Sequence, residues 1–271
     1  MSEGDYVLGT HDAELERLGL QHRLWRPRML EAWRRAGIVP GQTVLDVGAG
    51  PGYAALDLAE IVGRAGRVVA LERSRRFVEV LTARAAARGF TQLQVVEADV
   101  VTASFGVTMA DAAWCRWLLC FVSDPRAVLR RIRAALRPRG VAVFHEYADY
   151  GSWRMAPRLA EQELFVEQVM SSWRADGGEP DVGLALPEYL VEAGFELEVT
   201  RLHVEVIAPG DPLWQWPRSY LQVGAPRLVE LGLMTAPQAD DLARAVDKVE
   251  RLPHARMVTP IVIEVIARAG E

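Results

Sequence analysis

Short apolar runs alternate with amphipathic stretches through the first half of the chain. The apolar runs have the length and composition of buried strands. The stretches between them carry apolar residues at three- and four-residue spacing and end at glycine or proline, as helices do. The predicted strands cover residues 43–47, 67–71, 93–98, 112–116 and 141–147. Strands that alternate with helices of this length pair in parallel and carry helices on both faces of the sheet.

The pattern differs at the two ends of the chain. Residues 11–36 carry apolar groups at helical spacing ahead of a break at Pro40 and Gly41, which indicates one or two N-terminal helices. After residue 147 the strict alternation ends. The pattern there predicts helices over 153–175 and 187–193, a strand over 196–207, helices over 212–252 and a last strand over 258–267. Because Pro260 has no N–H for a sheet ladder, we expect an edge or bulged position in that last strand.

Together these elements predict an α/β fold. We expect a Rossmann-like, doubly wound, seven-stranded mostly parallel sheet with helices on both faces, an N-terminal helical cap and helical lid insertions. The expected division of the chain is a cap over 1–40, a ligand-binding core over 41–150, a helical insertion over 151–185, the remainder of the core sheet over 186–207 and 257–271, and a helical lid over 208–256.

Composition and charge narrow the choice of partners. Hydrophobic residues make up 50% of the 271 residues and charged residues 25%, as in ordinary soluble domains. The formal net charge of −5 argues against nucleic acid as the main partner. The first residues lack the basic and apolar regions of a signal peptide, and no apolar run reaches the ~18 residues of a membrane span. We therefore expect a cytoplasmic protein with no nucleic-acid or membrane partner, and the sequence leaves the oligomeric state open.

The two cysteines, Cys115 and Cys120, lie in one apolar run. They are too few for a disulfide framework, and the neighbouring sequence lacks the partners of a zinc site. We expect reduced thiols, as in the cytosol, and no metal site.

The first predicted strand runs into a glycine-rich turn, V-L-D-V-G-A-G-P-G-Y over residues 44–53. Gly48, Gly50 and Gly52 let a ligand lie against the backbone, because no Cβ stands in the way. Asp46 places a negative charge beside that ligand, unless it only caps the following helix. A carboxylate there repels the pyrophosphate of a dinucleotide but attracts an ammonium and a sulfonium. The turn therefore favours S-adenosylmethionine (SAM), with S-adenosylhomocysteine (SAH) as its product.

An acid follows or ends each of the first three predicted strands: Asp46, Glu72 and Asp99. Ligands of open parallel sheets bind outside the carboxyl ends of the strands. Glu72 lies 20 residues after Gly52, the spacing at which an acid meets ribose hydroxyls. Asp99 is suited to accept from the exocyclic amine of adenine. The helix that begins near Gly52 offers free N–H groups to a ligand carboxylate.

These motifs resemble class I SAM-dependent methyltransferases of the small-molecule type, related to the ubiquinone/menaquinone methyltransferases. V-L-D-V-G-A-G-P-G resembles the first motif of that family, A-L-E-R-S its second-strand acid and E-A-D-V its adenine-side acid. D-A-A-W-C-R-W-L-L-C-F-V-S-D-P resembles the fourth-strand motif, and L-R-P-R-G-V the turn into the fifth strand. The resemblance covers residues 35–150. Nicotinamide enzymes are the competing family, but Tyr53 leaves their G-x-G-x-x-G pattern unmet.

The resemblance implies a set of cofactor contacts around the methionine, ribose, adenine and methyl-donor positions. That set is Asp46, Gly48, Ala49, Gly50, Gly52, Glu72, Arg73, Asp99, Val100, Cys115, Arg116 and Trp117. Many relatives carry a small or amide residue where Arg116 stands, and often a histidine where Cys120 stands. Arg116 therefore has two open interpretations: it holds the SAM carboxylate or an anionic substrate, or it pairs with a strand-end acid.

Catalytic and substrate-binding candidates lie outside the glycine-rich turn. A base is needed only if the acceptor is protonated, and His145, Glu146 and Tyr147 lie near the end of the fifth strand. Strand alternation places only one of His145 and Glu146 on a given face, and a buried histidine without a catalytic role is the alternative for His145. The substrate-binding candidates are Trp214, Trp216, Tyr150 and Tyr6, and the tryptophans otherwise pack the lid on the core. Four residues of the N-terminal cap are further candidates to reach the site, unless they lie on the helix surface: Tyr6, His11, Gln21 and His22.

Three functions are compatible with these residues. The first is transfer of a methyl group from SAM to a small-molecule acceptor at oxygen, nitrogen or carbon. The second is SAM or SAH binding on the same fold without methyl transfer, or with other SAM-dependent chemistry, because a fold does not fix a reaction. The third is a nicotinamide oxidoreductase.

Overall fold

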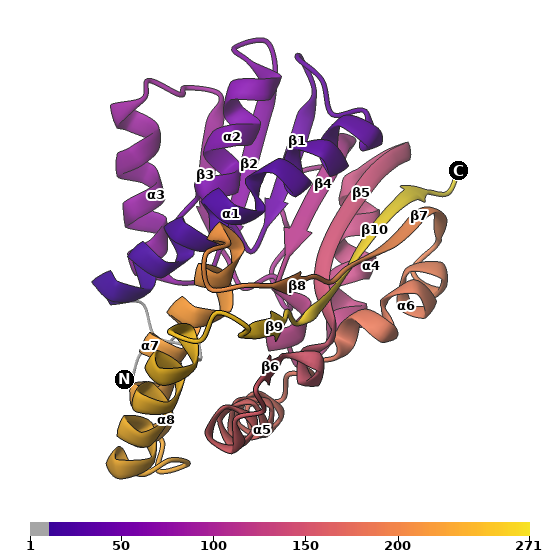
Figure 1. Ribbon diagram of the computed structural model, residues 1–271. Coiled ribbons are helices and arrows are strands. Elements are labelled where there is room, and N and C mark those ends of the chain that lie inside the picture. The colour runs from indigo at the N-terminus through magenta and orange to yellow at the C-terminus, as the bar shows by residue number, and fades with distance from the viewer. Residues whose placement is uncertain (1–10) are drawn as a thin grey trace.

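A seven-stranded sheet lies at the centre of the computed structural model, which describes residues 11–271 (Figure 1). Its strand order is β3-β2-β1-β4-β5-β10-β7. The strands are β1 (Thr43–Val47), β2 (Arg67–Glu72), β3 (Leu93–Glu97), β4 (Ala110–Arg116), β5 (Leu136–Asp149), β7 (Phe195–His203) and β10 (Ile261–Ala269). β10 runs antiparallel to β5 and β7, and the other neighbours pair in parallel. The predicted α/β fold with seven mostly parallel strands is confirmed.

Helices cover both faces of this sheet (Figure 1). One cluster of buried hydrophobic residues joins it to α1 (Asp12–Ala36), α2 (Tyr53–Val62) and α3 (Arg75–Ala87). A second cluster joins the opposite face to α4 (Pro125–Ala135) and α6 (Leu186–Glu192), and it extends beyond the end of the sheet to α5 (Ala160–Ala175). Val44 belongs to the first cluster and Leu45 to the second, because successive side chains of a strand point to opposite faces. This is the doubly wound arrangement that the pattern predicts.

The first described element, α1, is one continuous helix that ends at Gly37. Gly37 has a φ of 75°, a left-handed conformation that glycine adopts at little cost. α1 packs against α2, β5 and the later helix α7 (Gln215–Glu230). It therefore covers one end of the sheet and brings its own side chains close to the ligand-binding edge.

The chain after β5 departs from the prediction at three short strands. A second sheet of short antiparallel strands, β6 (Arg154–Ala156), β9 (Arg256–Val258) and β8 (Val206–Ile207), was not predicted. β6 replaces the start of the helix predicted over 153–175. Ala156 precedes a proline, and that position disfavours helical backbone. The strand predicted over 196–207 ends at His203, and its last residues pair with β9 instead.

The helical region predicted over 212–252 contains α7 and α8 (Ala236–Glu250). They are separated near Gly232, which has a φ of 71°. The last strand of the central sheet begins only after Pro260, and its register shifts between Ile261 and Val262. This register shift is the kind of irregularity that a bulged position predicts. An edge position is wrong, because β10 lies between β5 and β7. No helix within residues 11–271 is both long enough and apolar enough to cross a membrane.

Candidate active site

A cavity of about 340 Å³ lies at the carboxyl ends of the central parallel strands. Ten of the twelve predicted cofactor residues line it. They are Asp46, Gly48, Ala49, Gly50, Glu72, Arg73, Asp99, Val100, Arg116 and Trp117. Gly52 and Cys115 do not line it. Gly52 allows α2 to pack on α3, since a Cβ there would lie 2.0 Å from a methyl group of Leu81, and Cys115 is buried in the core.

The glycine-rich turn brings backbone into this cavity. Gly48 and Gly50 have φ values of 75° and 55°, which side chains other than glycine rarely adopt. A Cβ on Gly48 would lie 2.8 Å from the side chain of Leu118. Gly50 faces open space and donates its N–H to Glu72 at 2.8 Å. Of the three glycines, Gly50 alone faces open space, while Gly48 and Gly52 leave room for the side chains of Leu118 and Leu81.

Asp46 offers a buried carboxylate oxygen without a partner. Its Oδ2 has no hydrogen-bond partner within the described residues, although the backbone N–H of Ala55 interacts with the same carboxyl group. Burial raises the pKa of Asp46 to about 7, and the charge of Arg116 opposes that shift. An unpaired buried carboxylate is costly and is suited to an incoming cation. The ammonium group of SAM meets that requirement, so this side chain fits the expected cofactor.

Glu72 has both carboxylate oxygens fixed by backbone donors. Oε2 accepts from Gly50 and Oε1 accepts from the N–H of Ser74, each at 2.8 Å. Burial raises the pKa of Glu72. The backbone of Arg73 also interacts with this carboxylate, which has about four acceptor positions, so it keeps acceptor capacity for a ribose hydroxyl. Asp99 lies on the exposed rim of the cavity and accepts from the backbone N–H of Val101 at 2.8 Å.

Arg116 ends β4 and is held from α1. Its Nη2 lies 3.4 Å from Nδ1 of His22, and its guanidinium lies 5.0 Å from the ring centroid of Trp117. His22 Nε2 lies 3.1 Å from Asp57 Oδ2, so a neutral His22 donates to Asp57 and accepts from Arg116. Burial lowers the pKa of both His22 and Arg116, the latter to about 10. Within the described residues Arg116 forms no salt bridge with a carboxylate, but its charge interacts with that of Asp46, and both residues line the cavity.

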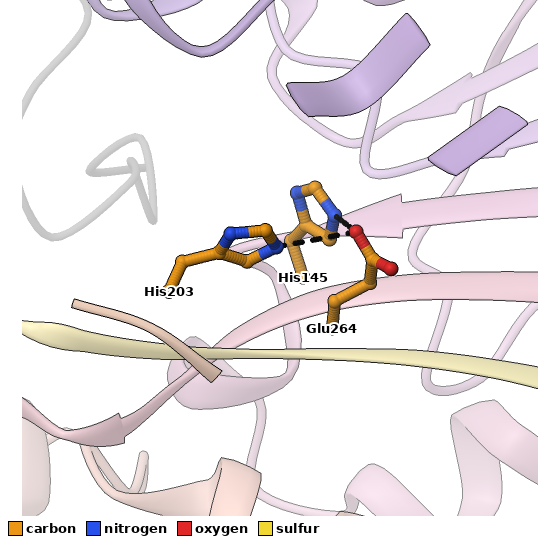
Figure 2. A group of neighbouring side chains, drawn as sticks. All are labelled: His145, His203 and Glu264. Carbon is orange, nitrogen blue, oxygen red and sulfur yellow. Dashed lines mark hydrogen bonds and ion pairs between the residues drawn. The ribbon is translucent and has the colours of Figure 1, made fainter. Parts of the chain in front are cut away.

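None of the three predicted catalytic residues lines this cavity. His145 on β5 is fully buried, and its Nε2 lies 3.2 Å from Oε2 of Glu264 on β10. His203 on β7 approaches the same oxygen at 3.2 Å, as Figure 2 shows, and Arg35 donates to Oε1 at 2.7 Å. Burial lowers the pKa of His145 to about 4. These surroundings agree with the alternative interpretation, in which His145 is a buried histidine without a catalytic role.

Glu146 points to the opposite face of the sheet. Its Oε1 accepts from the backbone N–H groups of Leu118 and Leu119, each at 2.9 Å. Burial raises the pKa of Glu146 to about 7. It therefore fixes the segment after β4 rather than facing the cavity, while Tyr147, the third candidate, lines a second pocket.

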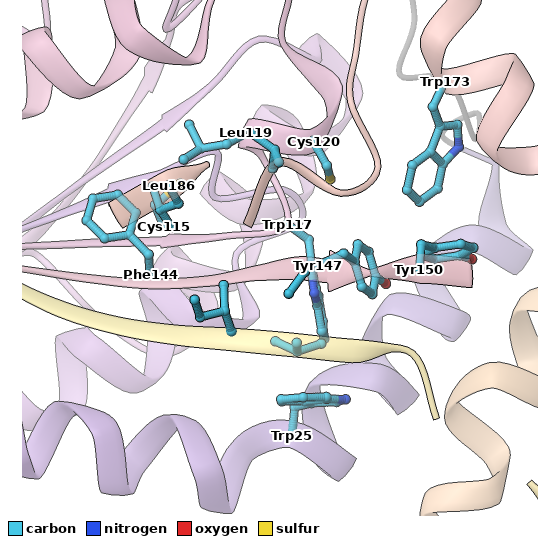
Figure 3. Packing of buried hydrophobic residues seen from close by; sticks show 14 of the residues in the cluster. Trp25, Cys115, Trp117, Leu119, Cys120, Phe144, Tyr147, Tyr150, Trp173 and Leu186 are labelled. Carbon is cyan, nitrogen blue, oxygen red and sulfur yellow. The ribbon is translucent and has the colours of Figure 1, made fainter. Parts of the chain in front are cut away.

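This second pocket is small, about 30 Å³, and its lining is mostly aromatic. It shares Gln21, Trp117 and Phe121 with the large cavity. Its remaining walls are Arg17, Tyr147, Tyr150, Trp153, Trp173, Trp216, Pro217, Tyr220 and Pro260. The ring planes of Trp117 and Tyr147 differ by 18° and those of Trp117 and Trp216 by 20°, with centroids 5.5 and 5.7 Å apart. Figure 3 shows Trp117, Tyr147, Tyr150 and Trp173 gathered in this region.

The substrate-binding candidates divide between pocket and core. Tyr150 and Trp216 line the aromatic pocket. Trp214 is buried and lines neither space. Its Nε1 donates to Glu250 on α8 at 2.7 Å, which agrees with the alternative of a packing role. Tyr6 lies outside the described residues. Sequence reasoning missed Trp173 and other aromatic walls from the insertion and the lid. The sequence signal for an aromatic pocket is the number of tryptophans, which is eight.

Comparison with known proteins agrees with this geometry. Residues 44–140 match a family described as "Methyltransferase domain". The 2-phytyl-1,4-naphtoquinone methyltransferase of Trichormus variabilis is 33% identical over 200 residues, which cover 67% of this chain and 86% of that protein.

Solved structures share the fold. The Haemonchus contortus phosphoethanolamine N-methyltransferase 2, solved with S-adenosyl-L-methionine, has a TM-score of 0.58 and 17% identity, covering 93% of this chain and 56% of that one. The 4+2 cyclase SpnF has a TM-score of 0.53 and 22% identity, covering 88% and 78%. Identities this low establish the fold alone.

Fold and site together define a Rossmann-like protein that binds a cationic adenosyl ligand. The chain belongs to the class I SAM-dependent methyltransferases, among those related to the ubiquinone/menaquinone methyltransferases. When bound, SAM supplies a methyl group on a sulfonium, which is already a good leaving group. The protein therefore has to orient the reactants and exclude water, which are effects worth up to ~7–11 kcal/mol.

Proposed function

We propose that the methyl acceptor is an aromatic small molecule of the quinone type and that its ring occupies the aromatic pocket. One observation carries this proposal: the pocket adjoins the cofactor cavity, and Trp117 forms a wall of both. Near-parallel rings on Trp117, Tyr147 and Trp216 offer flat surfaces to an aromatic ligand. The name of the Trichormus relative, a naphtoquinone methyltransferase, supports the same class of acceptor.

The roles of individual residues follow from the contacts that they offer. Asp46 receives the ammonium of SAM, and Glu72 with Arg73 receives the ribose. Asp99 and Val100 bracket the adenine. Arg116, held by His22, receives a carboxylate or an anionic acceptor. Tyr147 and Tyr150 contact the acceptor, and the helices within 208–256 act as a lid over it. His145 and Glu146 act by fixing the sheet and the segment after β4.

The tightness of the aromatic pocket bears on how an acceptor enters. A space of about 30 Å³ holds a single water, so a ring requires the lid helix α7, which carries Trp216 and Tyr220, to move outward. Closure over the bound ring then excludes water from the reacting atoms.

Turnover assays on an acceptor panel test this function. Purified protein is given SAM labelled in the methyl group together with reduced naphthoquinones, reduced benzoquinones, simple phenols and amines. We expect label in the reduced quinones, and mass spectrometry identifies the methylated atom. Label in the amines alone would overturn the proposal that the methyl acceptor is aromatic. Binding of NADH in place of SAM and SAH, measured by calorimetry, would overturn the cofactor site as well.

A second candidate is SAM binding without methyl transfer, because SpnF, described as a cyclase, shares this fold. Tight binding of SAM and SAH without turnover on any acceptor would favour it. We also propose that the protein acts in the cytoplasm and without nucleic acid, in keeping with its net charge of −5. Cell fractionation and a nucleic-acid binding assay at low salt test those two points.

A further inference from the structure

Gln21 is placed at the junction of the two spaces. It lies on α1, is 7% exposed and lines both the cofactor cavity and the aromatic pocket. The other two residues shared by both linings are Trp117 and Phe121. Of these three, Gln21 is the one with a side-chain amide, so a ligand that reaches from one space to the other passes beside it.

The orientation of this amide is fixed by Arg17. The Nη1 of Arg17 donates to Gln21 Oε1 at 2.8 Å. A guanidinium has donors and no acceptor, so the oxygen of the amide has to face it and the nitrogen has to face away. Gln21 Nε2 has no acceptor within residues 11–271. The amide therefore offers N–H groups, and no carbonyl, to the space that it lines.

Arg17 is itself held rigidly. Its Nε and Nη2 donate to the two carboxylate oxygens of Glu14 at 2.7 and 2.6 Å. Both side chains are buried. Glu14, Arg17 and Gln21 are three and four residues apart and lie on one face of α1. A buried two-point ion pair thus supports the donor at the junction, which is the arrangement of a preorganised binding group.

A second donor lies beside it. Trp117 lines both spaces, and its indole Nε1 is buried without a hydrogen-bond partner within the described residues. Unpaired donors at a ligand site are satisfied by a ligand that brings acceptor atoms. An oxygen of a quinone-type ring supplies such an atom, whereas the ring of an apolar hydrocarbon does not.

We propose that Gln21 is a specificity-determining residue that donates a hydrogen bond to a ring oxygen of the methyl acceptor, and that it holds the adjacent acceptor atom toward the cofactor cavity. The inference rests on the proposed quinone-type acceptor and adds the requirement for an oxygen at this position. A donor to that oxygen also favours its anionic form, which is the more nucleophilic one.

Calorimetry with two probes on SAH-saturated protein tests this assignment. The probes are 2-methyl-1,4-naphthoquinone and 2-methylnaphthalene, which have similar ring shapes but differ in their oxygens. We expect the wild type to prefer the quinone, and Gln21→Leu to lose that preference by about tenfold, the size of one hydrogen bond of this kind. Gln21→Glu, which keeps the length but presents a carboxylate, should lose it as well. Because Gln21 also lines the cofactor cavity, SAH affinity is measured for each variant, and the two probes are compared on protein saturated with SAH.

Gln222→Leu is the matched control, because Gln222 is exposed on α7 and lines neither space. It should leave the binding of both probes unchanged. Quinone preference retained in Gln21→Leu would overturn the role of Gln21 while leaving the quinone-type acceptor standing. A wild type that binds both probes equally and methylates no reduced quinone would overturn the acceptor class and this inference together.

Discussion

Oε1 of Glu146 accepts a hydrogen bond from the backbone N–H of Leu118 at 2.9 Å. The same oxygen accepts from Leu119 at 2.9 Å. The segment so fixed includes Trp117, which has a φ of 48° and lines both the cofactor cavity and the aromatic pocket. One buried acid on β5 therefore shapes the wall between the two spaces without lining the cofactor cavity itself.

Replacing Glu146 tests this positioning role. Glu146→Ala leaves the buried N–H of Leu119 and the half-buried N–H of Leu118 without an acceptor, and an unsatisfied buried group costs about 1–3 kcal/mol. We expect the free energy of unfolding in urea to fall by at least about 2 kcal/mol. Glu146→Gln keeps an acceptor oxygen in place and should retain most of the stability and the methyl transfer. Loss of turnover in a fully stable Glu146→Gln would instead point to direct proton transfer by this acid.

Asp46 should couple SAM binding to pH. Its pKa is raised to about 7 in the protein without ligand, so below that pH the carboxyl group carries a proton. An ammonium requires the ionised form, so binding releases a proton and SAM affinity should rise with pH up to about 7 and then level off. Calorimetry across this range in two buffers of different ionisation enthalpy measures the released proton.

Asp46→Asn is the matched variant for that measurement. It cannot ionise, so SAM affinity should fall by at least about tenfold and lose its pH dependence. A pH dependence that survives in Asp46→Asn would have to come from another group.

Glu72 should discriminate ligands through their ribose. Glu72→Gln keeps one acceptor oxygen for the N–H of Gly50 or Ser74, turns an amide NH2 toward the other N–H, and leaves fewer acceptor positions for the ribose. We expect SAM binding to weaken by about 1–3 kcal/mol. Binding of decarboxylated SAM, which keeps the ribose, should weaken equally, whereas binding of a 2′-deoxy analogue of SAM should weaken less. Unchanged SAM affinity in a correctly folded Glu72→Gln or Glu72→Ala would remove the ribose assignment.

The parts of the site that the sequence predicts are local in the chain. Asp46 and the glycines that follow lie within one strand and turn, where spacing alone fixes their relation. The wall residues Trp173 and Tyr220 come from α5 and α7, and nothing in the periodicity of those helices shows which face meets the pocket. Trp153 comes from the segment that the pattern assigned to a helix.

His145 shows the same limit from within the sheet. Alternation correctly separates it from Glu146, but its partner Glu264 lies 119 residues away on β10. That contact depends on β10 lying between β5 and β7, an order that strand patterns do not encode. The orientation of Gln21 likewise depends on buried charges on α1, which composition does not distinguish from exposed ones.

The buried pair of His145 and Glu264 should make the fold sensitive to acid. His145 has a pKa of about 4 in the folded protein against about 6.5 when unfolded, so the unfolded chain binds a proton first as the pH falls. Its contribution to stability is therefore present above about pH 6.5 and is lost toward pH 4. The pKa of Glu264 is lowered by the two histidines despite its burial, and it adds a loss of the same sign at still lower pH.

Urea unfolding across this range should show a shallower slope of unfolding free energy against pH for His145→Asn than for the wild type. His254→Asn, at an exposed position, should match the wild type, and an unchanged slope in His145→Asn would assign the acid sensitivity to other groups.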